Sequence, residues 1–170
     1  MNVTIRKATH QGVAPLIIEQ CDALLLGSML SPKSAEARFY YAHPQNRFWP
    51  VLAAVFGERQ PTTSDERAAF ALEHKIALWD VLSECDIVGA ADSTIKNAKF
   101  NDIDGLLKAY PNITRVFTTG GKAHELLLKY NKTVDNPIIK NAVRLPSTSS
   151  LNCAASLEQL IAAYDIIKQK

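Results

Sequence analysis

The sequence lacks the features that mark membrane-spanning, secreted and disulfide-bonded proteins. It has no run of about 18 apolar residues, and charged residues interrupt the N-terminal region where a signal peptide would be apolar. Its three cysteines are odd in number and lack C-x-x-C spacing, so neither a disulfide framework nor a zinc site is expected. We therefore expect a cytoplasmic protein that does not contact a membrane and holds no metal.

An excess of charge of one sign is lacking as well. The 19 basic and 17 acidic residues give a formal net charge of +2, which neither requires nor excludes a nucleic-acid partner. What is present is the composition of an ordinary globular protein, 47% hydrophobic and 21% charged. A chain of this length can bury about two-thirds of its unfolded surface. Residues 1–170 are therefore expected to form a single domain.

Short apolar or β-branched segments predict four strands, at 23–26, 86–90, 115–118 and 142–145. The first of them is apolar at every position, which is typical of a strand buried on both faces of a parallel sheet. Helical spacing occurs at 48–56, 63–74, 103–109 and 123–129, and a last helix follows Ser156. Ser156 and Gln159 have the spacing of a capping box.

This alternation of strands and helices predicts an α/β fold. We expect a three-layer α/β/α sandwich with a short, mainly parallel central sheet. Ligands of such sheets bind at the carboxyl ends of the strands. The loops after Leu26, Phe117 and Leu145 are therefore the places where a site is expected.

The loop after the first predicted strand is unusually rich in aromatic and polar residues. It begins Gly27-Ser28-Met29 and continues to Tyr40-Tyr41-Ala42-His43-Pro44-Gln45-Asn46-Arg47-Phe48-Trp49. A pocket that stacks a planar ring uses such aromatics, whereas a simple connection does not need them. The alternative that Phe48 and Trp49 begin a core-facing helix stays open.

These segments resemble the uracil-DNA glycosylase superfamily. The resemblance is closest to the hypoxanthine-DNA glycosylase (DNA-deoxyinosine glycosylase) branch and to the mismatch-specific uracil/thymine DNA glycosylases. Further segments resemble the hypoxanthine branch in the same order, at 76–82, 91–95 and 145–149, and the segment 156–164 resembles both branches. The resemblance implies a uracil-DNA glycosylase-like fold and a monofunctional DNA glycosylase of base excision repair. Such an enzyme hydrolyses the N-glycosidic bond of a flipped deaminated base, here hypoxanthine in deoxyinosine, and leaves an abasic site.

The resemblance also implies which residue is catalytic. The uracil-cleaving branches have an Asn or Asp that activates water where this chain has Met29, and a thioether cannot orient water. The hypoxanthine branch is thought to use the residue that corresponds to Asn46. An amide can accept a hydrogen bond from water, and its carbonyl oxygen can stabilise a positively charged sugar. A structural role for Asn46, as the cap of the following helix, remains an alternative.

The flipped base has an implied pocket. By its place in the motif, Tyr41 resembles the aromatic that stacks on the base, and core packing is the alternative for this side chain. The resemblance implies that backbone groups of Gly27, Ser28 and Met29 line the base edge. Leu30 stands where the hypoxanthine branch usually has proline, which would loosen this loop.

The resemblance implies that a second motif contacts DNA. Ser147, Thr148 and Ser149 suit close approach to phosphate, and Leu151 could fill the space that the flipped base leaves. The family often has Pro-Ala-Asn where this chain has Ser150-Leu151-Asn152, which puts the stiffness of the loop in question. Lys122, at a strand-to-helix turn, is a further candidate phosphate contact.

Two acidic residues in the matching segments are interpreted as structural. Asp80 and Asp92 are expected to anchor backbone amides. The alternatives are that Asp80 is a buried acid and that Asp92 shapes the pocket floor. No carboxylate pair is evident in the motifs, so the two-acid chemistry of ordinary glycoside hydrolases is not expected.

The resulting hypothesis has two alternatives. The implied enzyme is a monomer that acts on double-stranded DNA containing a deaminated base and needs no cofactor or metal. No lysine of the motifs is a convincing Schiff-base former, which favours a monofunctional enzyme. One alternative is a uracil, xanthine or mismatch-specific uracil glycosylase of the same fold. The other is a protein that binds damaged DNA without cutting it.

Overall fold

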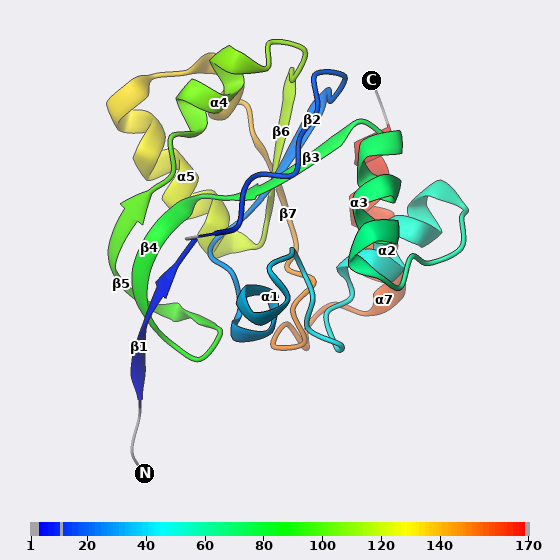
Figure 1. Ribbon diagram of the computed structural model, residues 1–170, viewed down its shortest axis with the longest axis horizontal. Coiled ribbons are helices and arrows are strands. Elements are labelled where there is room, and N and C mark those ends of the chain that lie inside the picture. Colours follow the sequence, from blue (N-terminus) through cyan, green and yellow to red (C-terminus); the bar gives the residue numbers. More distant parts are fainter. Residues whose placement is uncertain (1–3, 11, 169–170) are drawn as a thin grey trace.

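The centre of the molecule is a parallel four-stranded sheet. In the computed structural model, which describes residues 4–10 and 12–168, the strand order is β3-β2-β6-β7. The strands are β2 (Ala23–Gly27), β3 (Ile76–Asp80), β6 (Arg115–Thr119) and β7 (Val143–Leu145). All three pairings are parallel. The carboxyl ends therefore share one edge, and α1 (Pro32–Ala37) lies beyond it (Figure 1).

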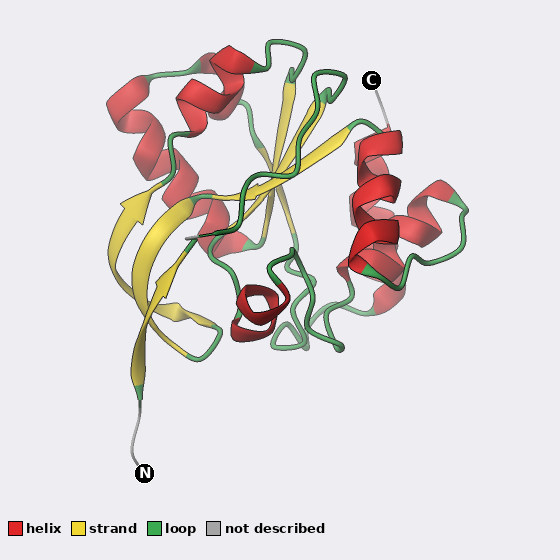
Figure 2. Cartoon of the chain, in the orientation of Figure 1, coloured by secondary structure: helices red, strands yellow, loops and turns green. Residues whose placement is uncertain are grey.

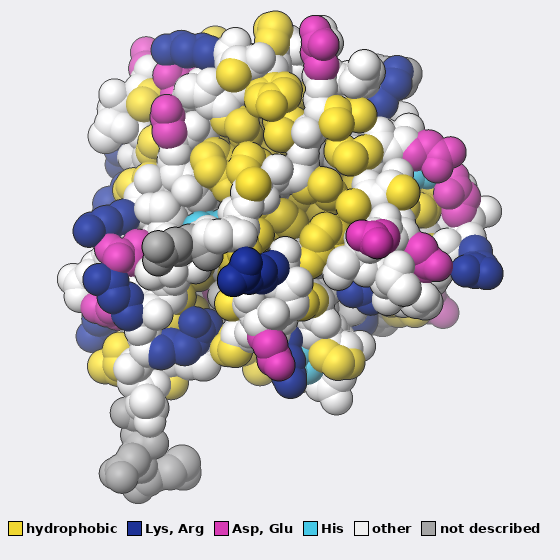
Figure 3. All heavy atoms as spheres, viewed as in Figure 1, with side chains coloured by type: hydrophobic (Ala, Val, Ile, Leu, Met, Phe, Trp, Pro, Cys, Tyr) yellow, Lys and Arg dark blue, Asp and Glu magenta, His cyan; other side chains and the backbone are white. Residues whose placement is uncertain are grey.

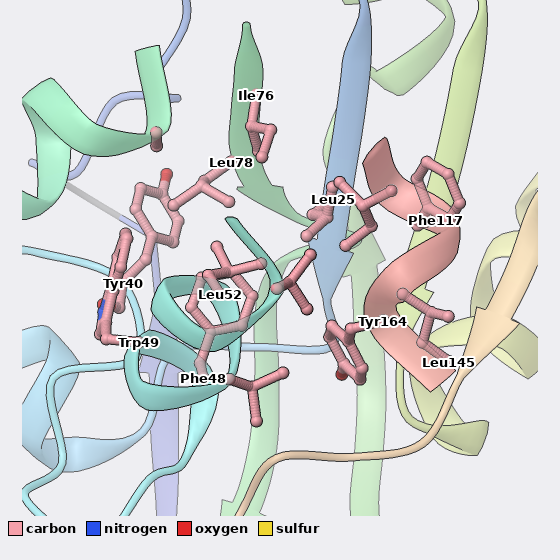
Figure 4. Packing of buried hydrophobic residues seen from close by; sticks show 14 of the residues in the cluster. Leu25, Tyr40, Phe48, Trp49, Leu52, Ile76, Leu78, Phe117, Leu145 and Tyr164 are labelled. Atoms are coloured by element: carbon pink, nitrogen blue, oxygen red, sulfur yellow. The ribbon is translucent and has the colours of Figure 1, made fainter. Parts of the chain in front are cut away.

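One face of this sheet is covered by helices alone. They are α2 (Phe48–Phe56), α3 (Ser64–Glu73) and α7 (Leu157–Tyr164), which is followed by the 3-10 turn η1 (Asp165–Lys168). Leu25 of the sheet packs in one cluster with the buried aromatics Phe48, Trp49 and Tyr164 (Figure 4). Phe48 and Trp49 thus begin a core-facing helix, the alternative that the sequence left open. Each large side chain buried here contributes about 2 kcal/mol of hydrophobic stabilisation.

The other face is covered by helices and by a second sheet. The helices are α4 (Ile103–Ala109), α5 (Gly121–Val134) and the short α6 (Pro137–Lys140). The second sheet is antiparallel, with order β1-β4-β5, and contains β1 (Ile5–Thr9), β4 (Leu82–Val88) and β5 (Ala91–Phe100). Figure 2 shows helices on both sides of the central strands and the antiparallel strands on one side only. The α/β/α arrangement is confirmed, with this sheet as an unpredicted addition.

The prediction of a parallel strand at 86–90 was wrong. Residues 86–88 end β4 of the antiparallel sheet, and Gly89, with φ +57°, turns the chain into β5. Leu82, Cys85 and Ile87 of β4 are buried, whereas its other residues are half-exposed, the pattern of a strand covered on one face. The fourth parallel strand is β3 instead, at Ile76–Asp80, a segment that we had used as a motif only.

The helix predictions agree more closely with the structure. Helices α2 and α4 have the predicted bounds, and α3 begins after Thr63, whose side chain caps it. Helix α5 is longer than predicted at both ends. Ser156 and Gln159 form the predicted capping box at α7. No helix in residues 4–10 and 12–168 is long and apolar enough to cross a membrane.

Charged side chains of both signs lie around the face shown in Figure 3, and hydrophobic ones gather near its centre. On the antiparallel sheet one acid pairs with two lysines. The carboxylate of Glu84 lies 3.0 Å from the ammonium of Lys7 and 2.9 Å from that of Lys99. Exposed pairs of this kind contribute little to stability.

Candidate active site

A cavity of about 700 Å³ lies where the parallel strands end. Gly27 ends β2, Asp80 ends β3, Thr119 ends β6, and Pro146 follows β7, and all four line it. The volume is large enough for a nucleobase and part of its sugar. The structure also brings to this cavity nine of the ten residues that we predicted for the site: Gly27, Ser28, Met29, Tyr41, Asn46, Ser147, Thr148, Ser149 and Leu151.

Lys122 is the exception. It lies in the first turn of α5 and does not line the cavity, although its neighbour Gly121 does. Its ammonium group lies 3.7 Å from the Glu125 carboxylate. Arg144 of β7, which we did not predict, is an exposed cation that does line the cavity.

The side chain of Asn46 joins two loops. Its Oδ1 accepts hydrogen bonds from the Phe48 backbone N–H and from the Thr148 hydroxyl, each 2.9 Å long. A backbone N–H can only donate, so Oδ1 must face it, which fixes the orientation of the amide. Both lone pairs of Oδ1 are therefore in use. None of the hydrogen bonds within the described part of the chain involves Nδ2. The N-cap residue of α2 is Arg47, which makes no side-chain cap, so the capping alternative holds only in that Asn46, one residue earlier, accepts from the first helical N–H. The same residue also lines the cavity.

The next residue, Arg47, holds the loop that carries the second motif. Its guanidinium donates to the carbonyl oxygens of Ala155, at 2.7 Å, and Asn152, at 2.9 Å. Its backbone N–H donates to the Thr148 carbonyl oxygen at 3.0 Å. This role of Arg47 was not predicted from the sequence. The only signal was its position next to Asn46 in the motif.

The ring of Tyr41 is fixed from three directions. Its backbone has φ +52°, a left-handed conformation that bulky residues rarely adopt and that clusters at functional sites. The ring stacks on Phe48 with centroids 3.8 Å apart, and its hydroxyl lies 2.8 Å from the Thr119 hydroxyl. Burial raises the pKa of Tyr41 well above its ordinary value, so the hydroxyl stays protonated. Because Phe48 covers one face, only the opposite face could stack on a base.

Gly27 is required by the close approach of an acid. A Cβ atom at this position would lie 2.5 Å from Oδ1 of Asp80 and 3.4 Å from the Tyr41 hydroxyl. Any larger residue would therefore displace the end of β3 or close the cavity.

Asp80 forms a buried pair with His10, contrary to the expectation that it anchors backbone amides. Its Oδ2 lies 2.5 Å from Nε2 of His10, and the two residues are only 4% and 7% exposed. Nδ1 of His10 faces the Val13 carbonyl oxygen at 3.2 Å. Both ring nitrogens thus face acceptors, which suits a protonated imidazole. Burial alone would lower the pKa of His10, but the hydrogen bond and charge of Asp80 outweigh it and raise the pKa.

Asp92 brings a second carboxyl group to the cavity. It lies on β5, and its Oδ1 accepts a 2.8 Å hydrogen bond from the hydroxyl of Ser28 rather than from a backbone amide, which corrects our interpretation. Burial raises the pKa of Asp92, the charge of Asp80 adds to this, and the hydrogen bond from Ser28 opposes it. The motifs gave no sign of a carboxylate pair, because the two acids come from different sheets.

Metal ligands are not grouped in the described part of the chain. Within residues 4–10 and 12–168, no three His, Cys, Asp or Glu side chains lie close enough together to hold an ion. Cys21 and Cys85 are buried, Cys153 is exposed, and all three are free thiols.

Known proteins show clear similarity to this chain. A protein of Methanosarcina barkeri (strain Fusaro) named hypoxanthine DNA glycosylase is 34% identical over 116 residues, which is 68% of this chain and 73% of the relative. A protein of the same name from Methanosarcina acetivorans is 32% identical over the same shares of the two chains. No protein-family model matches the sequence.

A solved structure is similar over almost the whole chain. It is the solution NMR structure of a candidate uracil DNA glycosylase from Methanosarcina acetivorans. The TM-score is 0.75, the identity is 25%, and the similarity covers 98% of this chain and all of the other.

Proposed function

This chain belongs to the hypoxanthine branch of the uracil-DNA glycosylase superfamily and is a DNA glycosylase, and we propose that it releases hypoxanthine from deoxyinosine in double-stranded DNA. The observation that carries the proposal is the hydrogen bond between Asn46 and Thr148. It joins the two motifs at the cavity where a flipped base would lie.

The proposed reaction is hydrolysis of one bond. The oxygen of a water molecule attacks C1′ of the sugar, the bond from C1′ to N9 of the base breaks, and its electron pair leaves with the base. One proton of the water ends on the released base, and the hydroxyl stays on the sugar. Because the sugar passes through a state with positive charge, the site must orient the water and stabilise that charge. The scheme uses no metal or organic cofactor.

Asn46 and Thr148 would hold the water together. The backbone bond to Phe48 keeps one lone pair of Oδ1 occupied, and the Thr148 hydroxyl occupies the other. A hydroxyl hydrogen rotates freely, so Thr148 can turn away and leave Oδ1 to accept from water. The carbonyl dipole of Asn46 would then also favour the positive sugar.

The base would stack on Tyr41, with the backbone of Gly27, Ser28 and Met29 at its edge. Flipping a base costs a few kcal/mol, which stacking and edge hydrogen bonds must offset. The fixed ring of Tyr41 suits this role because it loses no rotational freedom when the base arrives.

The loop after β7 would contact the DNA. The Oγ atoms of Ser147 and Ser149 accept hydrogen bonds from backbone N–H groups of their own loop, so their hydroxyl hydrogens remain for phosphate oxygens. Leu151 is 65% exposed and lines the cavity, as expected of a wedge that fills the vacated stack. Arg144 and Lys122 supply positive charge nearby.

We further propose that the enzyme is monofunctional and acts as a monomer. A lyase step needs a desolvated amine at the sugar. Among the described residues that line the cavity there is no lysine. The nearest candidate by sequence, Lys33, has a side chain that is 58% exposed.

The test is single-turnover release of bases from end-labelled duplexes containing deoxyinosine, deoxyuridine or deoxyxanthosine at one position. We expect alkali-dependent cleavage at inosine, faster than at the other two bases. Cleavage at inosine without alkali would contradict the monofunctional assignment.

The same experiment also tests the two alternative functions, a glycosylase for another base and a protein that binds damaged DNA without cutting it. The solved structure described as a candidate uracil DNA glycosylase favours testing uracil first among them. Faster cleavage at uracil would move the substrate assignment to that base. Binding to damaged duplexes without release of any base would contradict a role in catalysis.

A further inference from the structure

One end of the cavity is acidic, and the carboxyl groups of both Asp80 and Asp92 line it. Asp80 uses Oδ2 for His10, and its Oδ1 packs against Gly27. Within residues 4–10 and 12–168, no hydrogen bond or ion pair involves Oδ2 of Asp92. This oxygen is therefore an acceptor without a partner in the described part of the chain, on a carboxyl group that, unlike that of Asp80, forms no ion pair there.

The carboxyl group of Asp92 is held in place rather than mobile. The Ser28 hydroxyl donates to Oδ1 over 2.8 Å, and Ser28 is itself 6% exposed in the loop after β2. The turn that joins β4 to β5 brings Ala90 to the same cavity wall, together with Ile87. An anchored Oδ1 leaves Oδ2 as a fixed acceptor, which is the arrangement that base recognition requires.

The charges around Asp92 are mixed. Asp80 at the end of β3 makes ionisation of Asp92 less favourable, and Lys122 in the first turn of α5 makes it more favourable. Lys122 thus favours the ionised form of Asp92, although it does not itself line the cavity. In its ionised form the carboxyl group accepts hydrogen bonds only and has no proton to donate.

Deamination changes a base in a way that such an acceptor detects. Adenine has a lone pair at N1, and deamination to hypoxanthine replaces it with an N–H donor. Cytosine changes in the same way at N3 when it becomes uracil. A carboxylate attracts the new donor and repels the lone pair of the parent base. Guanine already carries an N–H at N1, so a carboxylate acceptor alone would not exclude guanine.

We propose that Asp92 is a specificity-determining residue whose free oxygen accepts a hydrogen bond from the ring N–H that deamination creates. The inference rests on the proposed glycosylase function and names what that site selects. Asp92 would distinguish hypoxanthine from adenine, whereas Asn46 and Thr148 act on the water. Ser28 is then a positioning residue for the carboxyl group.

The experiment compares deoxyinosine with deoxynebularine, a purine nucleoside whose N1 carries a lone pair, in duplexes with the same opposite base. Single-turnover rates and duplex affinities are measured for the wild type, Asp92→Ala and Asp92→Asn. We expect the wild type to prefer inosine and both variants to lower this preference about ten- to a hundredfold. Asp92→Asn should also raise the rate with nebularine, because its amide can donate to N1.

Two further variants serve as controls. Asp86→Asn changes another acid of the same hairpin, whose Oδ2 accepts a 2.7 Å hydrogen bond from Asn97 and which does not line the cavity. The preference of this variant for inosine over nebularine should match that of the wild type. Ser28→Ala should lower the preference less than Asp92→Ala, because the carboxylate remains but loses its anchor. Thermal unfolding shows whether each variant is folded.

The outcomes separate this inference from the proposed function. If inosine is cut but the preference is unchanged in folded Asp92→Ala, the inference is wrong and the function stands. An equal loss with both nucleosides would show a structural role only and also overturns it. If the wild type releases no base, the function fails, and the affinities for the two duplexes still test Asp92.

Discussion

The two ends of the cavity are built in different ways. At the Asn46 end, an amide, a hydroxyl and backbone groups meet, all of them uncharged, and they come from two loops that are each continuous in sequence. At the acidic end, His10, Asp80 and Asp92 come from the end of β1, from β3 and from β5. The first end joins two loops through uncharged groups, and the second joins charged groups from three separate segments. Variants should therefore affect chemistry at one end and stability or selectivity at the other.

The largest effect is expected from Asn46→Ala. Loss of the group that positions water should lower the single-turnover rate with inosine by about a thousandfold, within the range typical of such groups. The affinity for the duplex should change little, because Asn46 is not expected to bind phosphate.

A matched control separates catalysis from capping. Thr63 caps α3, away from the cavity, through a hydrogen bond from the Glu66 N–H. Thr63→Ala should cost about 1 kcal/mol of stability, as the loss of a cap does, without slowing base release. If both variants retained the wild-type rate, Asn46 would be a cap and nothing more.

At the acidic end, His10→Ala should lower the free energy of unfolding by about 3 kcal/mol, because it leaves the buried carboxylate of Asp80 unpaired. Urea denaturation measures this loss. In an Asp80→Asn background the same substitution should cost clearly less. Equal costs in the two backgrounds would mean that the pair contributes no coupling energy.

Gly27→Ala tests the close approach of Gly27 to the carboxyl group of Asp80. The added Cβ would meet Oδ1 of Asp80, which cannot move easily because His10 holds it, so we expect a loss of about 2 kcal/mol in stability. At Gly121 the added Cβ would meet only the end of the flexible Arg144 side chain. Gly121→Ala should therefore be close to neutral by the same thermal or urea measurement. A Gly27 variant as stable as the wild type would contradict this packing.

Thr148→Val should slow base release about tenfold, because it removes the hydroxyl that shares Oδ1 with the water but keeps the shape of the side chain. The double variant with Asn46→Ala should be no slower than Asn46→Ala alone, since the two residues act as a unit. Additive losses would show that Thr148 acts separately, for instance on the DNA.

The smallest effect is the pH dependence of stability. The raised pKa of His10 means that the folded state favours the protonated imidazole, so this stabilisation is fully present below about pH 6.5. It should be lost as the pH rises through the raised pKa. Urea unfolding across this range should show the decline in the wild type and not in His10→Ala. Equal slopes would mean that other groups cause it.

Residues at the Asn46 end were named from the family resemblance, and the structure brings them to one cavity, whereas the pairing of His10 with Asp80 was not predicted. Asn46 and Thr148 are 102 positions apart, and both were indicated because their segments resemble two motifs of the family, not because any local pattern places them together. His10 and Asp80 are 70 positions apart, and no local pattern indicates that they meet. The error at 86–90 has the same origin. An apolar segment alone does not distinguish a strand buried on both faces from one covered on a single face.

The hydrogen bonds of Arg47 explain how the loop after β7 can depart from the family pattern. Both of its guanidinium contacts are with main-chain carbonyl oxygens, which every amino acid provides. Replacement of the usual Pro-Ala-Asn by Ser150-Leu151-Asn152 therefore leaves these anchors in place. The path of the loop is specified by a residue about a hundred positions earlier in the chain. The side chains of the loop can accordingly diversify while the course of its main chain is preserved.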